Sequence, residues 1–339
     1  MLTRRNLLTY AMLTGLGSGL GSRLAYGSPS DKTSVFFIAM PSVKNNYYKA
    51  YFTSFVQLVQ NFINVVHEKD RLQVVVDNET RLKLNNVIPK PYLLTGQIPD
   101  IWMRDFSPIQ TKAGLFKFRY QPSYLNQYDA KYIEQKYMRW FKSLGLAYQS
   151  VDLCLDGGNF NYNGEDSGVT TARVFADNQD KTPAEIISLL KQTLGLKHLA
   201  ILPEVPGDTT GHSDGMVKWL NQHQLAVSEF EQPLAKEVIS AIRNDLKAVE
   251  VVPMPYQPSS GYWKGFADAS GVYANAMTTD NAIYVPQFGK SADQRAIRIF
   301  KQHATQEVIP VSVGRVGEMG GSVRCLTWQL TGQAARIYG

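Results

Sequence analysis

The sequence predicts an α/β fold built as a ring of five similar modules, and three observations point to it. Amphipathic helices recur five times along the 339 residues, apolar strands follow them, and a short polar motif closes each unit. Alternation of strands and helices is typical of α/β architectures, and its recurrence indicates repeated modules. With 44% hydrophobic and only 19% charged residues, the chain has ample apolar material for a large core.

The N-terminal residues predict an export sequence that lies outside the fold. They read Met-Leu-Thr-Arg-Arg, continue through a weakly polar run over residues 9–20, and reach a small-residue site before Gly27. This segment resembles a twin-arginine signal, so we expect residues 1–27 to be removed and the protein to be periplasmic or secreted. The run is too short and too rich in glycine and serine for a membrane anchor, so we expect no stable membrane insertion after cleavage.

Charge and cysteine content exclude several classes of protein. Residues 1–27 carry three arginines and no acid, so their removal lowers the formal net charge from +6 to +3. Such a modest charge does not indicate nucleic-acid binding. Two cysteines, Cys154 and Cys325, are too few for a disulfide scaffold.

Apolar residues at three- and four-residue spacing predict five helices. They are expected at residues 49–66, 132–144, 183–194, 234–249 and 292–304. Capping boxes are predicted at residues 182–185 and 291–294, where side chains satisfy free amides of the first turn. Gly195 is expected to end one helix in a left-handed conformation.

Short β-branched or apolar runs predict strands between these helices. The clearest runs are residues 72–76, 199–202 and 308–313. No Pro-, Gly- or Ser-rich linker separates the units, so we expect residues 28–339 to form a single domain.

Five polar motifs close the five units. They are Ile-Trp-Met-Arg-Asp at 101–105, Cys-Leu-Asp-Gly-Gly-Asn at 154–159, Gly-His-Ser-Asp-Gly at 211–215, Tyr-Ala-Asn at 273–275 and Gly-Gly-Ser-Val-Arg-Cys at 320–325. Their main residues, Asp105, Asp156, His212, Asn275 and Cys325, are separated by 51, 56, 63 and 50 positions. We expect the motifs to lie at strand ends that converge on one central site.

Cys325 is the candidate nucleophile. It follows two glycines and a short strand-like stretch, a placement that suits a thiol presented where the backbone approaches a ligand closely. A free cysteine is also often a small buried apolar residue, so this motif alone leaves both interpretations open.

His212 and Asp214 form the second candidate pair. On a strand, residues two apart project from the same face, so a histidine that moves protons and a carboxylate that holds a cation would act side by side. The alternative is an ordinary polar turn between glycines. The same motif also matches the Gly-x-Ser-x-Gly elbow of serine hydrolases, but that elbow precedes a helix, and residues 216–220 are expected to continue as a strand, which disfavours Ser213 as a nucleophile.

Asp105 and Asp156 complete the polar set. Asp105 follows Trp102 and Arg104, so an aromatic ring, a cation and an anion meet at one expected strand end; the alternative is an Arg–Asp pair that caps a loop. Asp156 precedes two glycines, which allow either close approach to a ligand or a simple turn.

Metal and cofactor sites are not expected. The sequence has no Cys-x-x-Cys, His-x-x-x-His or acid-rich loop, and it lacks a phosphate-binding loop and a dinucleotide fingerprint. Cysteine chemistry supported by histidine and carboxylates is the remaining interpretation.

Taken together and in order, the five motifs resemble those of the guanidine-modifying pentein superfamily. Within it the chain is similar to the agmatine deiminase and bacterial-type peptidylarginine deiminase family, from about residue 35 to the C-terminus. The matching residues are Trp102 to Pro108, Asp156 to Gly158, Gly211 to Asp214, Tyr273 to Asn275, and Gly320 to Gln329.

The resemblance implies a fivefold pseudosymmetric α/β propeller that forms one catalytic domain. It implies Cys325 as nucleophile, His212 as general acid and base, and Asp105 with Asp214 as the clamp for a guanidinium group. Trp102, Asp156 and Asn275 would contact the substrate. The implied reaction releases ammonia and leaves a ureido product, with no cofactor or metal.

Two departures from the family pattern leave the substrate open. Arg324 stands where many members have histidine, and it would either favour the thiolate of Cys325 or compete with a cationic substrate. Asp156 stands where many have glutamate. Near residues 120–122 only Arg119 is available to bind a substrate carboxylate, so a small guanidino compound and an arginine-containing peptide both remain candidates.

Other activities stay open at this point. Amidinotransfer and dimethylarginine hydrolysis share the first half-reaction on the same fold, and a non-catalytic arginine-binding protein is a third alternative. Cys154 is expected to pack in the core, with a disulfide to Cys325 as the alternative.

Overall fold

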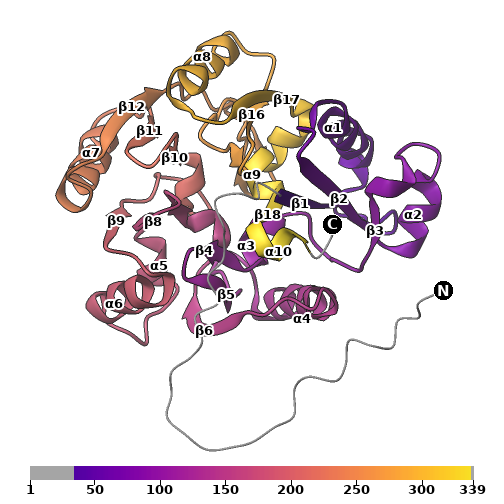
Figure 1. Cartoon of the computed structure of the whole chain (residues 1–339), viewed down its shortest axis with the longest axis horizontal. Helices are drawn as coiled ribbons and strands as arrows, with labels where there is room; N and C mark the ends of the chain where they lie inside the picture. The colour runs from indigo at the N-terminus through magenta and orange to yellow at the C-terminus, as the bar shows by residue number, and fades with distance from the viewer. Residues whose placement is uncertain (1–33, 337–339) are drawn as a thin grey trace, which may run out of the picture.

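Five small sheets form the framework of the computed structural model, which describes residues 34–336 (Figure 1). Each sheet begins with an antiparallel pair of strands and continues with a parallel pair. A helix connects the parallel strands, as such connections usually require. The repeating unit is therefore strand, strand, helix, strand, and the five units lie around a common centre.

Four of the modules are continuous in sequence. The first comprises β4 (Ile109–Thr111), β5 (Gly114–Arg119), α4 (Gln127–Ser143) and β6 (Gln149–Cys154). The second comprises β7 (Asn161–Tyr162), β8 (Ser167–Thr171), α6 (Pro183–Leu194) and β9 (His198–Leu202), with the short helix α5 (Arg173–Ala176) before α6. The third comprises β10 (Val217–Trp219), β11 (Gln224–Ser228), α7 (Leu234–Asp245) and β12 (Glu250–Met254). The fourth comprises β15 (Met277–Thr278), β16 (Ala282–Gln287), α8 (Asp293–His303) and β17 (Glu307–Ser312).

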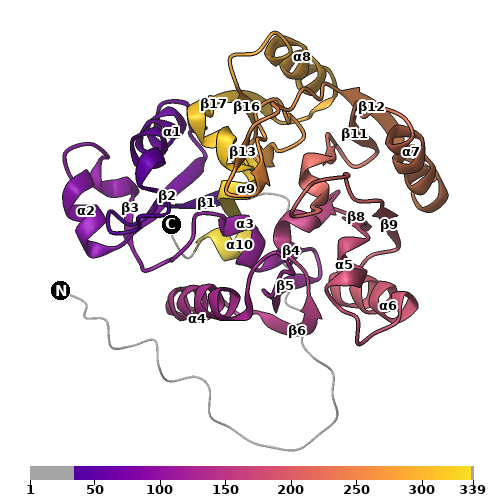
Figure 2. The same cartoon turned by 180° about the vertical axis from the view of Figure 1, so that it is seen from behind.

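The fifth module closes the ring because it joins the two ends of the described chain. Strand β18 (Thr327–Thr331) pairs antiparallel with β1 (Ser34–Ala39), from Ser34 opposite Thr331 to Ile38 opposite Thr327. Helix α1 (Phe52–Val65) follows the 3-10 turn η1 (Lys49–Tyr51) and leads to β2 (Asp70–Val76); α2 (Asn78–Leu84) and η2 (Lys90–Tyr92) then lead to the edge strand β3 (Leu93–Thr95). The C-terminal segment therefore lies beside the N-terminal strand in both views (Figures 1 and 2).

The long helices cover the outside of the ring (Figures 1 and 2). In α1, the residues Phe55, Leu58, Val59 and Phe62 are buried, which is the spacing expected for one apolar face of a helix. Strand β1 is buried along its whole length, whereas the outer strand β17 alternates between buried and exposed positions. The core is therefore distributed among the modules, between each sheet and its helix.

A cluster of aromatic rings holds the closing strand against the first module. The indole of Trp328 on β18 stacks on Phe37 of β1 at 5.2 Å and packs edge-on against Phe141 of α4 at 5.7 Å. Its Nε1 donates a hydrogen bond to the Pro108 carbonyl at 2.9 Å. Because aromatic rings bury large areas, this cluster ties the two chain ends to a neighbouring unit.

The structure confirms the predicted fold class and most of the predicted elements, with differences at the ends of helices. Helix α6 occupies residues 183–194 as expected, with the Thr182–Glu185 capping box and a left-handed Gly195 at φ 70°. Helix α4 begins five residues earlier than predicted because Asn126 caps it. Helix α7 ends at Asp245, four residues early, because the backbone of Leu246 leaves the helical region.

The capping box predicted at residues 291–294 is wrong. Ala292 is the N-cap of α8 and makes no side-chain cap. The Asp293 carboxylate instead accepts hydrogen bonds from the Tyr273 hydroxyl at 2.6 Å and from the Gly289 amide at 2.8 Å. The helix begins one residue later than the box requires, so its N-cap position holds an alanine, which has no side-chain acceptor.

The predicted export sequence, residues 1–27, lies outside the described residues. Among the helices of residues 34–336, none combines the length and the apolar character needed to cross a bilayer.

Removing the Trp328 ring should destabilise the protein strongly. Trp328→Ala empties a fully buried site, and such changes typically cost roughly 3–5 kcal/mol. Chemical denaturation should therefore show a large loss in the free energy of unfolding. Tyr128→Ala, at a position 79% exposed, serves as the control and should change it little; equal losses in the two variants would contradict the role of the cluster.

Candidate active site

Four of the five polar motifs lie at short helical turns between the modules, and residues 273–275 lie in a non-helical turn before β15. The helical turns are α3 (Met103–Phe106), η3 (Gly157–Asn159), η4 (Ser213–Gly215) and α9 (Val323–Leu326), the last preceded by η5 (Gly314–Met319). The expectation that Cys325 follows a strand, and that His212 and Asp214 share one, is therefore wrong. Each turn connects the last strand of one module to the first strand of the next, so the motifs still face the centre of the ring.

The side chain of Asn275 determines the turn that carries Cys325. Its Oδ1 accepts hydrogen bonds from the amides of Ser322 at 3.2 Å, Arg324 at 3.1 Å and Cys325 at 3.3 Å. Three amides that converge on one oxygen bend the backbone into a tight helical turn, a constraint that strand-like residue preferences do not reveal.

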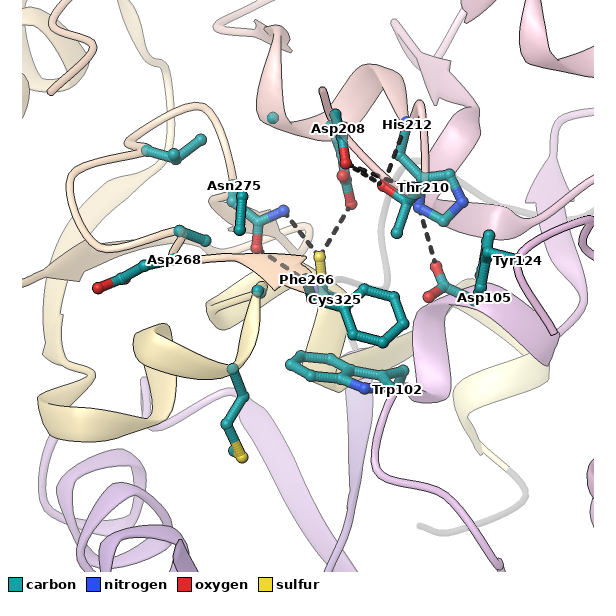
Figure 3. A pocket seen from close by; sticks show the side chains of 18 of the residues that line it. Trp102, Asp105, Tyr124, Asp208, Thr210, His212, Phe266, Asp268, Asn275 and Cys325 are labelled. Atoms are coloured by element: carbon teal, nitrogen blue, oxygen red, sulfur yellow. Dashed lines mark hydrogen bonds and ion pairs between the residues drawn. The ribbon is translucent and has the colours of Figure 1, made fainter. Parts of the chain in front are cut away.

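A cavity of about 570 Å³ lies at the centre of the ring. Six of the seven predicted site residues line it: Trp102, Asp105, His212, Asp214, Asn275 and Cys325. Figure 3 shows Cys325 between Asn275 and the ring of Phe266, with Trp102 beneath and with His212 and Asp105 across the cavity. Residues from all five motifs thus meet around this cavity or directly behind it.

Asp156 was expected to contact the substrate, and the structure places it differently. It is absent from the cavity wall, and its Oδ2 lies 3.1 Å from Nε2 of His212. The same oxygen accepts a hydrogen bond from the Tyr124 hydroxyl at 2.7 Å. Asp156 therefore orients the imidazole from behind, in the way that a carboxylate orients a catalytic histidine.

The imidazole of His212 lies between two carboxylates. Its Nδ1 is 3.6 Å from Oδ1 of Asp105. Burial alone would lower the pKa of His212, but the negative charges of Asp105 and Asp156 outweigh it and raise the pKa to about 10. Burial raises the pKa of Asp105, and the neighbouring aspartates add to this while His212 opposes it. The histidine is accordingly a cation at neutral pH.

Two hydrogen bonds position the sulfur of Cys325. It accepts one from Nδ2 of Asn275 at 3.0 Å and donates one to Oδ2 of Asp214 at 3.5 Å. Burial raises the pKa of the Cys325 thiol well above its ordinary value, and Asp214 and Asp105 raise it further. Burial and these two carboxylates therefore favour the protonated form of the thiol.

Arg324 does not line the cavity, and its guanidinium packs against Asp214. Its Nη1 lies 2.9 Å from Oδ2 of Asp214, and its Nη2 donates a hydrogen bond to the Phe160 carbonyl at 2.7 Å. Both terminal nitrogens also contact the Gly157 carbonyl at 3.3 Å. The guanidinium thus occupies one side of a carboxylate expected to bind substrate.

Two glycines allow these groups to approach one another. A Cβ on Gly158 would lie 2.5 Å from both Oδ1 of Asp105 and Nδ1 of His212, and one on Gly321 would lie 2.5 Å from the Trp102 ring. Real side chains do not tolerate such distances. The paired glycines of these motifs therefore serve close packing around the site.

Three further observations settle alternatives left open by the sequence. Ser213 is fully buried, its Oγ accepts a hydrogen bond from Asn161 at 3.0 Å, and strand β10 follows its turn, so no serine elbow forms. Arg119 pairs with Asp152 at 3.2 Å and is absent from the cavity wall. Cys154 is free, with its Sγ 3.2 Å from the Gln121 carbonyl, and burial raises its pKa to about 12.

Sequence reasoning missed Tyr124 and Phe266. Phe266 belongs to a hairpin of β13 (Tyr262–Trp263) and β14 (Phe266–Ala267), inserted between the third and fourth modules. Its ring lies 6.0 Å from that of Tyr124, which is itself 6.1 Å from the His212 ring. Neither residue belongs to a recurring motif, so no periodic pattern in the sequence identifies it.

The cavity wall is rich in carboxyl groups. Six aspartates line it, namely Asp100, Asp105, Asp129, Asp208, Asp214 and Asp268, and the described lining residues include no lysine or arginine. Aromatic side chains make up much of the remaining wall. Within residues 34–336, no cluster of three or more His, Cys, Asp or Glu side chains is arranged to hold a metal ion.

The His212 ring should remain protonated through neutral pH. NMR titration of its ring carbons, assigned by comparison with His212→Asn, should show a midpoint at about pH 10. Asp156→Asn removes one of the negative charges that raise this pKa and should lower that midpoint markedly, toward the ordinary value of about 6.5. A midpoint that stays near 6.5 in the unmodified protein would contradict the charge arrangement described above.

The chain is similar in sequence to a known family and to several named proteins. Residues 29–330 match the family model described as Porphyromonas-type peptidyl-arginine deiminase. A Shewanella sp. (strain MR-7) protein named "Putative agmatine deiminase" is 24% identical over 231 residues, which cover 58% of this chain and 62% of the relative. The match thus spans a little under two thirds of that relative.

Solved structures share the same fold. The agmatine deiminase of C. jejuni superposes with a TM-score of 0.73 at 19% identity, covering 90% of this chain and 95% of that one. The agmatine deiminase of Enterococcus faecalis superposes with a TM-score of 0.72 at 16% identity, covering 89% and 94%.

Proposed function

Because the chain belongs to the Porphyromonas-type peptidyl-arginine deiminase family, we propose that it hydrolyses a guanidino group to ammonia and a ureido product through a covalent adduct on Cys325. One observation carries the proposal. A sulfur, a protonated imidazole and two carboxylates, drawn from residues 105 to 325, surround a single cavity.

The carboxylates of Asp105 and Asp214 bind the guanidinium group of the substrate. A planar guanidinium presents five donors, and paired charge-assisted hydrogen bonds to carboxylates hold it in one orientation. The flat rings of Trp102 and Phe266 suit the faces of such a cation. Its central carbon then lies within reach of the Cys325 sulfur.

Substrate binding activates the nucleophile. A cation held beside the thiol lowers the pKa of Cys325, so the thiol releases its proton to solvent and the thiolate adds to the central carbon. His212 donates a proton to the departing nitrogen, and ammonia leaves as the carbon–nitrogen bond breaks. The substrate remains attached to the sulfur as a thiouronium adduct.

Water completes the reaction. Neutral His212 removes a proton from a water molecule that adds to the same carbon, and the carbon–sulfur bond breaks to give the ureido product. The second proton of that water passes to the sulfur as the carbonyl group forms, which restores the thiol and the protonated imidazole. General acid and base steps of this kind each contribute roughly 10²- to 10⁴-fold in rate.

The charge of the cavity favours a substrate with a second positive group, such as agmatine. The α-carboxylate of free arginine would face aspartates with no lysine or arginine among the described lining residues to bind it. Like charges in a partly buried site disfavour binding. The relatives named as agmatine deiminases support the same choice.

The substrate panel comprises agmatine, free arginine and an internal arginine peptide, with ammonia and ureido product measured for each. Agmatine should give the highest kcat/KM, at least about tenfold above free arginine, since one unfavourable charge contact costs about 1.4 kcal/mol or more. Cys325→Ser should lose essentially all activity, whereas Cys154→Ser should retain it.

The panel also separates the alternatives. Ammonia from the peptide but not from agmatine would reassign the substrate. A new guanidino product formed on adding an amine acceptor would indicate amidinotransfer. Binding of agmatine without any ammonia would identify a non-catalytic arginine-binding protein and overturn the proposed function.

We further propose that the protein is exported through the twin-arginine route. Arg4 and Arg5 support this, as does the weakly polar run that follows them. Replacing both arginines by lysine should keep the unprocessed chain in the cytoplasm, as measured by fractionation and by the mass of the N-terminus. Unchanged processing and location of the double variant would count against the route.

A further inference from the structure

Arg324 has a fixed position in the site. Its guanidinium contacts the Asp214 carboxylate and the carbonyls of Gly157 and Phe160, at distances of 2.7–3.3 Å. The side chain is buried, with 10% of its surface exposed. Carbonyls and a carboxylate thus hold both terminal nitrogens, which gives the guanidinium one defined orientation.

One oxygen of Asp214 links this arginine to the nucleophile. Oδ2 of Asp214 contacts Nη1 of Arg324 at 2.9 Å and Sγ of Cys325 at 3.5 Å. The other oxygen, Oδ1, takes part in neither contact, and Asp214 lines the cavity. The carboxylate is thus oriented with one oxygen toward the sulfur and the arginine, which leaves the other for a ligand.

From this geometry we propose that Arg324 is a positioning residue that orients Asp214 against Cys325 and supplies a built-in cation that favours the thiolate before substrate binds. The proposal extends the proposed function, but its first consequence, the reactivity of the thiol, does not require turnover.

The other charged groups around Cys325 show why this cation matters. Asp214 and Asp105 raise the pKa of the thiol beyond the effect of burial, while the Asn275 hydrogen bond and Arg324 lower it. His212 lies across the cavity, paired with Asp105 and Asp156. Arg324 is bonded directly to the carboxylate that touches the sulfur, so it offsets the nearest negative charge.

Two further buried basic residues, Arg104 and Lys218, lie near Arg324, but neither forms an ion pair with Asp214 among the described contacts. Burial and, after it, the charge of Arg324 lower the pKa of Arg104 to about 9, and the Arg104 guanidinium bonds to Gln329. Burial, then Arg324 and Arg104, lower the pKa of Lys218 well below its ordinary value. Among the described residues, Arg324 is therefore the cation paired with Asp214.

The arrangement has a cost for substrate binding. A carboxylate already paired with an arginine attracts a second cation less strongly than a free one. Arg324 is therefore expected to weaken binding of the substrate guanidinium while it increases the reactivity of the thiol. These opposite effects on KM and kcat distinguish a positioning role from a merely structural one.

The test compares Arg324→Gln with the unmodified protein by two measurements. The rate of iodoacetamide labelling of Cys325, located by mass spectrometry and measured across pH without substrate, reports the thiolate. In Arg324→Gln the labelling profile should shift at least about one pH unit upward. With agmatine, kcat should fall at least tenfold, while KM stays constant or decreases.

Three companion variants keep the result interpretable if Arg324→Gln is less stable. Arg324→Lys keeps the charge and should recover part of the labelling rate. Asp214→Asn combined with Arg324→Gln removes both charges of the pair, and its labelling profile should return toward that of the unmodified protein. Arg315→Gln, an exposed arginine paired with Glu318, is the matched control and should change neither measurement.

Failure of the proposal and failure of the proposed function give different results. Labelling profiles that coincide for Arg324→Gln and the unmodified protein, with a loss of kcat that follows the loss of thermal stability, would overturn the positioning role even if agmatine is hydrolysed. A shifted profile in a protein that hydrolyses none of the guanidino compounds would support the role of Arg324 and overturn only the proposed activity.

Discussion

The pairing of opposite charges in a buried space is the constraint on which the rest of the site depends. Asp105 and Asp156 lie on either side of His212, and Asp214 lies against Arg324, all with little exposure to solvent. Burying an unpaired charge is unfavourable by several kcal/mol. Each of these carboxylates therefore has a cation beside it. The tight turns, and glycines that leave room for neighbouring side chains, allow these groups to approach one another.

The candidate site needs all five modules of the ring. Each unit contributes one short turn. The side chains of the site therefore come from segments about fifty or more residues apart, and only the closed ring brings these segments together. Closure of the ring by β18 and β1 places the turn with Cys325 directly before the last strand. The position of the proposed nucleophile is therefore coupled to the long-range pairing that completes the fold.

The site combines two demands that oppose each other. A cationic substrate is best held by free carboxylates, whereas a thiol in an anionic, buried cavity resists ionisation. Arg324 affects both properties, because it offsets the negative charge of Asp214. It contacts the same Asp214 oxygen that contacts the sulfur. For the proposed substrate with a second positive group, the carboxyl groups elsewhere on the wall add to the attraction.

Much of the fold and most of the candidate site residues could be predicted from the sequence alone. Local rules, namely helical periodicity, the Thr182 cap and the left-handed Gly195, defined helices such as α6, and the order of the five motifs identified the family together with Cys325, His212, Asp105 and Asp214. Only the tertiary structure decided that Asp156 lies behind His212 and that Arg324 pairs with Asp214. It also placed four of the motifs at helical turns and brought Tyr124 and Phe266 into the site. These features depend on contacts such as that between Arg324 and Asp214, 110 positions apart. Periodicity and capping act over a few residues, whereas the packing of the modules around the ring sets contacts at such separations.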